Sequence, residues 1–306
     1  MTFSERDKKV IWHPYTQMKD ASVISIVRGE GAGLFDEMGK RYIDAISSWW
    51  VNIHGHAHPY IAEKLAEQAK VLEHVIFAGF THPVAVILAE RLLSHLPGNQ
   101  EKIFYSDNGS TAVEVALKMA IQYWVNKGKN KTKIIAFKSS YHGDTFGAMS
   151  VSSRSIFTSP FNRYLFDVEF IDVPVKSNER SAFIQLEKIT DSNDVIAFIF
   201  EPLVMGVGGM LMYEPAILDN MLSLCRGKGV LTIADEVMTG FYRTGRMFAT
   251  DFLVEKPDII CLSKGITGGT MALGVTSCCQ EIYNAFLSDN QDKTLLSIDY
   301  EYDAVG

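Results

Sequence analysis

A single lysine, Lys264, follows directly on an apolar run in the stretch DIICLSKGITGGT (residues 258–270). The apolar run predicts a buried strand, and an ammonium group at its end is costly to desolvate unless it is paired or neutralised. A desolvated lysine loses its proton more readily and becomes a nucleophile toward aldehydes. Taken alone, however, this stretch favours a surface lysine whose stem lies along an apolar wall.

Three other segments place polar or aromatic groups just after apolar runs. Gly109 and Ser110 open a predicted helix, where free N–H groups can bind an anion, although an ordinary cap by Ser110 or Thr111 is the simpler explanation. Asp235 could pair with a cationic cofactor nitrogen, but a strand-end acid that caps the next turn explains it better alone. Tyr141 could stack on a planar ligand or pack half-buried on the core.

The four segments together match the needs of one cofactor. Pyridoxal 5'-phosphate (PLP) requires an anion cradle, a ring stacker, an acid for its pyridine nitrogen and a lysine for a Schiff base. All the candidates follow predicted strands, and ligands of open α/β sheets bind at the carboxyl ends of the strands. We therefore predict a PLP site in which Lys264 is buried because it is tied to the cofactor aldehyde.

The elements that must position these residues follow from the hydrophobic pattern. Residues 23–46 predict a small antiparallel meander with a hairpin turn at EMGK. Residues 59–72 and 82–96 have helical spacing. Short apolar strands then alternate with helical segments, which indicates an α/β fold with a mostly parallel sheet covered on both faces. The predicted strands are 102–106, 133–137, 168–173, 195–202, 230–237 and 259–263.

Composition excludes several classes of partner. A net charge of −7 argues against nucleic acid or an anionic membrane. No apolar run approaches the roughly 18 residues of a membrane helix. Four cysteines without C-x-x-C spacing indicate reduced thiols and a cytoplasmic protein. His54, His56 and His58 alternate as metal ligands can, but no matching ligand cluster accompanies them, so we expect no metal.

The chain resembles the class III (subgroup II) aminotransferases of PLP fold type I. The resemblance covers roughly residues 10–285 and rests on the motifs DNGSTAVEVALKMA, YHGDTFGAMS, IFEPLVMGVGGM, IADEVMTGFYRTG and SKGITGGT. It implies that Lys264 holds PLP and shuttles the proton, while Asp235 keeps the pyridine nitrogen protonated. It also implies that Gly109 and Ser110 hold the phosphate and that Tyr141 lies near the ring. Residues 1–52 would belong to a small domain and 53–306 to the PLP-binding large domain.

Within that family, IWHPYTQM, AISSWWVNIHGHAHP and ITGGTMALG resemble members of the biotin pathway. This likeness implies amino transfer from S-adenosylmethionine to 8-amino-7-oxononanoate, giving 7,8-diaminononanoate. Tyr15 and Trp49, with Tyr141, match the aromatic residues that contact the substrate in that group. The resemblance further implies a homodimer with active sites at the subunit interface.

Three alternatives remain open on the sequence. One is another class III enzyme, such as an ω-amino acid aminotransferase or an aminomutase. A second is a non-catalytic chain that keeps the fold. The third is a P-loop nucleotide binder, because ADEV resembles a Walker B strand, but no G-x-x-x-x-G-K-[ST] motif occurs.

The last residues depart from the family pattern. Family members continue past the lysine strand with a segment resembling HGxTFxGNP and then a small-domain portion that carries an arginine for the substrate carboxylate. Residues 286–306 match neither feature, and no arginine follows Arg246, as in a C-terminally truncated chain. We therefore expect this chain, expressed alone, to be poorly soluble or monomeric, with little or no aminotransferase activity.

Overall fold

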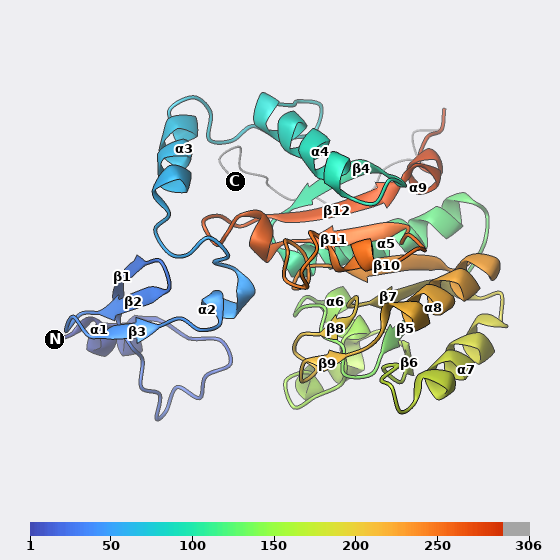
Figure 1. The fold of residues 1–306 in the computed structure, drawn as a ribbon, viewed down its shortest axis with the longest axis horizontal. Helices are drawn as coiled ribbons and strands as arrows, with labels where there is room; N and C mark the ends of the chain where they lie inside the picture. The colour runs from blue at the N-terminus through green and yellow to red at the C-terminus, as the bar shows by residue number, and fades with distance from the viewer. Residues whose placement is uncertain (290–306) are drawn as a thin grey trace.

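A seven-stranded sheet forms the centre of the computed structural model, which describes residues 1–289 (Figure 1). Its strand order is β4–β12–β11–β10–β7–β5–β6. Neighbours from β11 to β6 pair in parallel, whereas β12 is antiparallel to both β11 and β4. The strands are β4 (Gln100–Ser106), β5 (Lys133–Phe137), β6 (Glu169–Ile171), β7 (Val195–Phe200), β10 (Leu231–Asp235), β11 (Ile259–Leu262) and β12 (Gly274–Cys279). The predicted mostly parallel α/β sheet is confirmed, and β12 is a strand that the sequence pattern did not predict.

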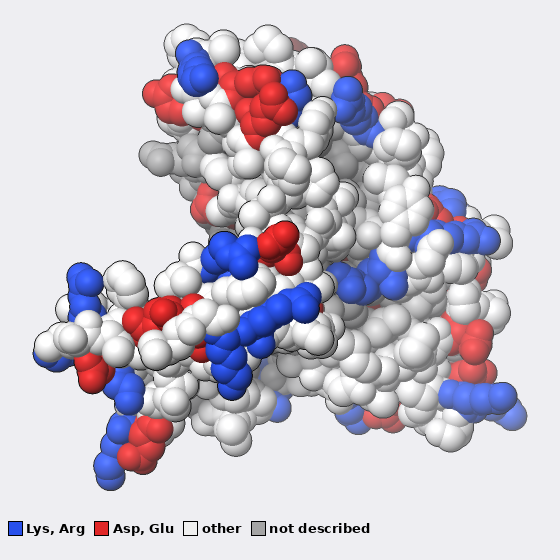
Figure 2. Space-filling model, turned by 60° about the vertical axis from the view of Figure 1, so that its left-hand side comes forward, with Lys and Arg blue, Asp and Glu red and all other residues white. Residues whose placement is uncertain are grey.

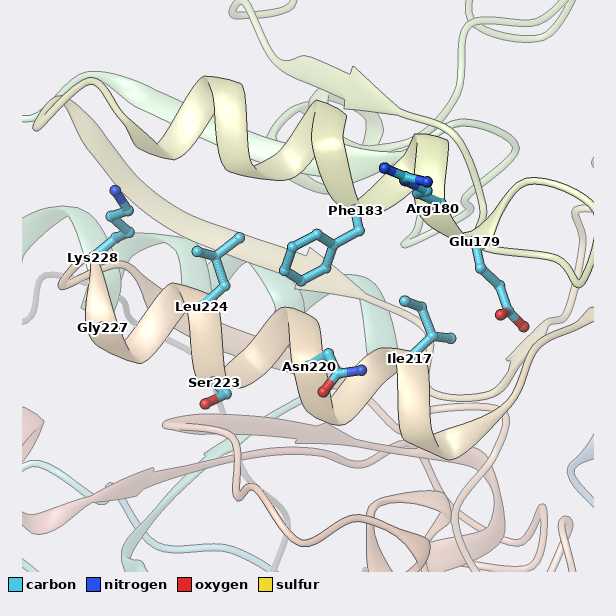
Figure 3. Close-up of a pocket in the computed structure, with 9 residues that line it drawn as sticks. All are labelled: Glu179, Arg180, Phe183, Ile217, Asn220, Ser223, Leu224, Gly227 and Lys228. Carbon is cyan, nitrogen blue, oxygen red and sulfur yellow. The ribbon is translucent and has the colours of Figure 1, made fainter.

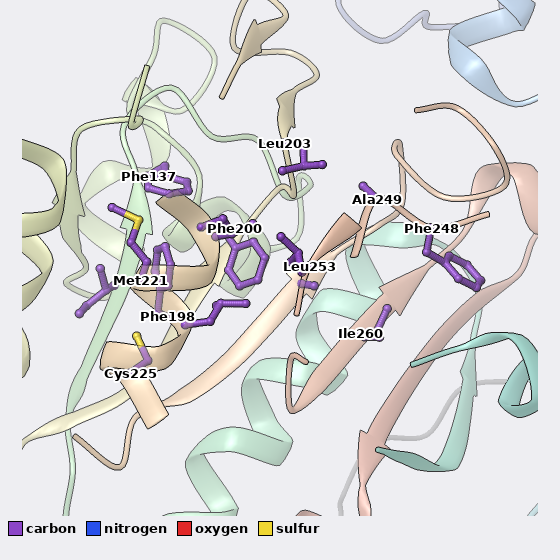
Figure 4. Close-up of a cluster of buried hydrophobic side chains, with 14 of the residues drawn as sticks. Phe137, Phe198, Phe200, Leu203, Met221, Cys225, Phe248, Ala249, Leu253 and Ile260 are labelled. Atoms are coloured by element: carbon purple, nitrogen blue, oxygen red, sulfur yellow. The ribbon is translucent and has the colours of Figure 1, made fainter. Parts of the chain in front are cut away.

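Helices cover both faces of this sheet. One face packs on α4 (Pro83–His95), α7 (Glu179–Thr190) and α8 (Pro215–Gly227), and the other on α5 (Gly109–Asn126), α6 (Phe146–Val151) and α9 (Gln280–Asn284). Strand β7 is buried on both faces, so it reads as the unbroken apolar run VIAFIF. Figure 4 shows Phe198 and Phe200 of β7 beside Met221 and Cys225 of α8, within one buried cluster.

The N-terminal elements lie beside the large sheet (Figure 1). Strands β1 (Ile26–Glu30), β2 (Gly33–Asp36) and β3 (Arg41–Ile43) form the predicted antiparallel meander, whose turn carries a bond from Gly39 N–H to the Asp36 carbonyl. Helix α1 (Phe3–Val10) precedes the meander, and α2 (Ser47–Trp50) and α3 (Pro59–Ala69) follow it. The division of the chain at residue 52 stays a prediction.

The remaining elements are short. Strands β8 (Val204–Met205) and β9 (Leu211–Met212) form a hairpin after β7, and single 3-10 turns span Ser159–Tyr164, Ala249–Phe252 and Lys264–Ile266. Figure 2 shows basic and acidic side chains interspersed over one face of the molecule. None of the helices within residues 1–289 is long and apolar enough to span a bilayer. Most of the departing tail, residues 290–306, lies outside the described residues.

The fully buried ring of Phe198 gives a test of this packing. It meets Phe137 at 5.1 Å and Phe200 at 5.2 Å between ring centroids. We expect Phe198→Ala to lower the free energy of unfolding by about 3–5 kcal/mol, because it removes buried contacts and leaves a cavity. Phe80→Ala, at a ring that is mostly exposed, is the control and should cost less than about 1 kcal/mol. Urea titration followed by circular dichroism would measure both, and equal losses would contradict this description of the core.

Candidate functional site

The parallel strands bring the predicted site residues to one edge of the sheet. In β10, Asp235 pairs in register with Cys261 of β11, three residues before Lys264. Tyr141 follows β5, and α5 begins directly after β4. The predicted lysine, acid, aromatic residue and helix N-terminus therefore all follow the ends of sheet strands, as the sequence pattern required.

Asp235 is buried and held by two hydrogen bonds. Its Oδ2 lies 2.7 Å from His142 Nδ1, and its Oδ1 accepts the N–H of Val237 at 3.0 Å. The other ring nitrogen of His142, Nε2, is buried and has no hydrogen-bond partner in residues 1–289. His142 thus supports the acid directly. These hydrogen bonds fix the orientation of the buried Asp235 carboxylate.

Lys264 is largely enclosed and conformationally strained. Its backbone φ is +48°, in the left-handed region that non-glycine residues rarely adopt. Its ammonium lies 4.9 Å from the centre of the Trp50 ring. Burial lowers the pKa of Lys264, and the charges of Asp235 and Glu201 partly oppose that shift. Such strain and such a lowered pKa are typical of functional lysines.

The N-terminus of α5 offers a cradle for an anion. Asn108 caps the helix by accepting the N–H of Thr111 at 3.0 Å, which leaves the first N–H groups of the helix, those of Gly109 and Ser110, without intrahelical acceptors. A Cβ on Gly109 would meet Val237 Cγ1 at 2.7 Å, so only glycine fits this close approach. The hydroxyl of Ser110 accepts the N–H of Asp144 at 3.3 Å. The turn therefore caps the helix and also presents the N–H groups of Gly109 and Ser110 as donors for an anion.

The three predicted substrate-contacting aromatic residues lie together around one carboxylate. Tyr15 and Tyr141 both donate their hydroxyls to Asp144 Oδ2, the latter at 2.7 Å, and Tyr15 packs edge-on against Trp49 at 5.9 Å. Burial and the Asp144 carboxylate raise the pKa of Tyr15, and burial with bonds to Tyr15 and Asp144 raises that of Tyr141 well above its usual range. Both phenols are therefore neutral donors at ordinary pH.

A strained turn presents the paired tryptophans. Ser47, Ser48, Trp49 and Trp50 all have φ between +48° and +67°. Each such residue costs roughly 1–2 kcal/mol relative to the right-handed conformation. Asp44 supports the turn by accepting the N–H of Ser48 at 3.0 Å and its hydroxyl at 2.8 Å. This backbone places the Trp50 ring over Lys264 and the Trp49 ring against Tyr15.

Sequence reasoning missed three groups at the site: Trp50, Glu201 and Arg243. Glu201 ends a buried apolar run, which is the same signal that singled out Asp235. Arg243 donates to the Trp50 carbonyl at 3.2 Å, and its charge adds to the lowering of the Lys264 pKa. Trp50 directly follows Trp49 in the sequence. The left-handed turn directs the two rings to different partners, which the sequence pattern does not reveal.

Two hollows differ in their relation to this site. A groove of about 710 Å³ lies between α7 and α8, where Phe183 points toward Leu224 (Figure 3), and it contains none of the predicted residues. A second hollow of about 750 Å³ is lined by Trp50, Met238 and Arg243. Since Trp50 also covers Lys264, the second hollow adjoins the site.

The alternating histidines are engaged separately. His56 Nε2 lies 2.8 Å from Asp44 Oδ2, and the rings of His54 and His58 meet edge-on at 6.1 Å. Among the described residues, no group of three or more His, Cys, Asp or Glu side chains is placed to hold a metal ion.

Comparison with known proteins shows the same architecture. Residues 15–297 match the aminotransferase class-III family. An adenosylmethionine-8-amino-7-oxononanoate aminotransferase from Synechococcus elongatus is 50% identical over 293 residues, which are 93% of this chain and 69% of that protein. The crystal structure of the protein of that name from Methanocaldococcus jannaschii superposes with a TM-score of 0.93 at 38% identity, covering 98% of this chain and 70% of that one. An amine transaminase from an uncultivated Pseudomonas species, solved in its PLP-bound form, gives 0.91 at 30% identity, with 96% and 71% covered. The predicted fold type is confirmed.

Gly143 gives a test of the cradle. Its φ is +132°, and an added Cβ would approach Ser110 Cβ to 2.6 Å. We expect Gly143→Ala to displace Ser110 and to weaken PLP binding at least about tenfold, as loss of one charge-assisted contact would. Gly128→Ala is the control, because Gly128 also has a positive φ but has open space around its Cβ position. Fluorescence titration with PLP would measure both, and equal affinities in the two variants would contradict the cradle.

Proposed function

Because the chain belongs to the class III aminotransferase family, we propose that its site binds PLP and transfers an amino group from S-adenosylmethionine to 8-amino-7-oxononanoate, in biotin biosynthesis. The observation that carries the proposal is the convergence of an enclosed, strained lysine, a buried His–Asp pair and an open helix N-terminus. Two relatives that bear this activity in their names are 50% and 42% identical to the chain.

The residues of the site fit PLP. The Gly109 and Ser110 N–H groups at the start of α5 would hold the phosphate, since helix N-termini favour anions. Tyr141 would lie near the ring. Asp235, already oriented by His142, would accept a hydrogen bond from the protonated pyridine nitrogen. Lys264 would hold the aldehyde carbon, and the lowered pKa of its amine favours the neutral, nucleophilic form.

Proton handling follows from the same contacts. When bound, PLP supplies an electron sink for the carbanion formed next to the amino group. The negative charge of Asp235 favours a protonated ring nitrogen, which that sink requires. The free amine of Lys264 would be the base that moves the proton. The Trp50 ring, 4.9 Å from the nitrogen, partly covers this amine.

The aromatic group around Asp144 suits the substrates. Tyr15 and Trp49 offer flat apolar surface to a long aliphatic keto-amine, and a sulfonium cation can rest against aromatic faces. The Asp144 carboxylate, held by two phenol hydroxyls, would attract the substrate ammonium. An ω-amino acid aminotransferase is the second candidate, supported by the superposition on the amine transaminase. A panel of amino donors, assayed for 7,8-diaminononanoate, decides between them.

We also propose that the protein is cytoplasmic and that the family's homodimer is the state in which its site works. The four cysteines of residues 1–289 are free thiols, as is usual in a reducing compartment. Tyr15, Trp49 and Phe157 are all more than half exposed although they contact one another, with Tyr15 and Phe157 at 5.5 Å. A group of exposed aromatic residues of this kind marks an interaction surface, and a second copy of the chain would cover it.

Lys264→Ala tests the cofactor assignment directly. We expect the wild-type chain, incubated with PLP and reduced with borohydride, to carry the cofactor on Lys264 by peptide mass spectrometry. The alanine variant should carry none at the site and should show no turnover above background, because the Schiff-base partner and the proton-shuttling amine are both lost. Lys256→Ala, which removes a lysine bonded only to the Leu253 carbonyl, is the control. Labelling that persists in Lys264→Ala and disappears in Lys256→Ala would overturn the assignment.

Trp49→Ala tests the substrate assignment. We expect weaker binding of 8-amino-7-oxononanoate, by about 2–3 kcal/mol or some 30–150-fold, since a large apolar contact is lost. Binding of PLP should stay within about twofold, because Trp49 faces Tyr15 rather than the cradle. Isothermal titration calorimetry with each ligand would measure the two affinities. Unchanged affinity for the keto substrate would remove Trp49 from the site.

A further inference from the structure

Glu201 is a buried acid that ties two loops of the site together. It follows β7, and its side chain is almost fully enclosed. Oε1 accepts the N–H of Tyr141 at 3.0 Å, and Oε2 accepts the N–H of Gly206 at 2.8 Å. Each oxygen therefore holds a different loop, one after β5 and one after β7. The next N–H along, that of His142, is held by Ser152 Oγ at 2.8 Å.

Three ionisable groups near the strand ends interact electrostatically with Glu201. They are His142 in the loop after β5, Asp235 at the end of β10 and Lys264 in the turn after β11. Its negative charge favours the protonated form of Lys264, as does that of Asp235, while Arg243 has the opposite effect. Unlike Asp235, which is paired with a histidine ring, Glu201 uses its oxygens on backbone amides.

We propose that Glu201 is a positioning residue: its carboxylate fixes the Tyr141–His142 loop against the cofactor site, and its charge favours a proton on the nitrogen of Lys264. The inference rests on the proposed role of Lys264. Burial, opposed by the charge of His142 and reinforced by that of Asp235, raises the pKa of Glu201 to about 7. The charge is therefore present above pH 7 and is lost as the pH falls through this value, so its influence on Lys264 is greatest on the alkaline side.

Glu201→Gln removes the charge of the side chain and keeps its shape nearly unchanged, so it tests the role of the charge. The visible absorption of PLP bound to Lys264 reports whether the linking nitrogen carries a proton, so a pH titration of the loaded protein gives a midpoint. We expect the midpoint to fall by about half a pH unit or more in Glu201→Gln, because a nearby negative charge is lost. Glu201→Asp keeps the charge and should keep a midpoint near that of the wild type.

Glu114→Gln is the matched control. Glu114 also accepts two backbone N–H groups, from Gly147 at 2.6 Å and Ala148 at 3.1 Å, but it supports the start of α6. Its neutralisation should leave the midpoint unchanged. A folded, PLP-loaded Glu201→Gln variant with the wild-type midpoint would overturn the charge role.

Hydrogen exchange tests the positioning role independently and covers the case in which the glutamine variant does not fold. Glu201→Asp draws the carboxylate back by one methylene, so the amides of Tyr141 and Gly206 should exchange at least about tenfold faster than in the wild type. Unchanged exchange at both amides would overturn the positioning role. Borohydride labelling of wild-type Lys264 separates failure of the proposed function from failure of the inference about Glu201. If Lys264 is not labelled, the proposed function is rejected. If it is labelled but the Glu201 variants keep the wild-type midpoint and exchange rates, only the inference about Glu201 is rejected.

Discussion

The site depends on one constraint, the cost of burying ionisable groups at the carboxyl edge of the sheet. An isolated charge taken from water costs several kcal/mol even after relaxation, so each buried group needs a partner that remains in place when the site is empty. Asp235 has His142 and the Val237 amide, and Glu201 has two backbone amides. Lys264 has no such hydrogen bond among the described residues, and burial beside the Trp50 ring lowers its pKa.

Backbone strain follows from the same requirement. Lys264 takes a left-handed conformation as the first residue of the 3-10 turn that follows β11. The α2 turn that covers it is left-handed over four residues. Strain of this size persists only where surrounding contacts hold it, here the Asp44 bonds below the turn and the Arg243 bond to the Trp50 carbonyl.

The sequence predicts the sheet well because its strands are buried on both faces and read as unbroken apolar runs, as in VIAFIF of β7. It misses β12, whose sequence GVTSCC mixes small and polar residues that are nonetheless buried between two antiparallel neighbours. At the site, Lys264, Asp235 and Tyr141 are found by their position after a strand. Glu201 has the same position and is passed over, since its partners are backbone amides that no side-chain pattern reveals.

Asp235 and Glu201, two acids at the ends of neighbouring strands, differ in their hydrogen-bond partners and therefore in their chemistry. Asp235 lies beside an imidazole, whereas the carboxylate of Glu201 is bonded to two backbone amides. Burial, together with the nearby charge of Asp235, raises the pKa of Glu201. A nearby carboxylate disfavours the ionised form of its neighbour. Glu201 is therefore an acid of this site whose charge varies near neutral pH. That difference makes Asp235 suited to a permanent partner of a cationic ring, and Glu201 to a carboxylate that shapes the loop around it.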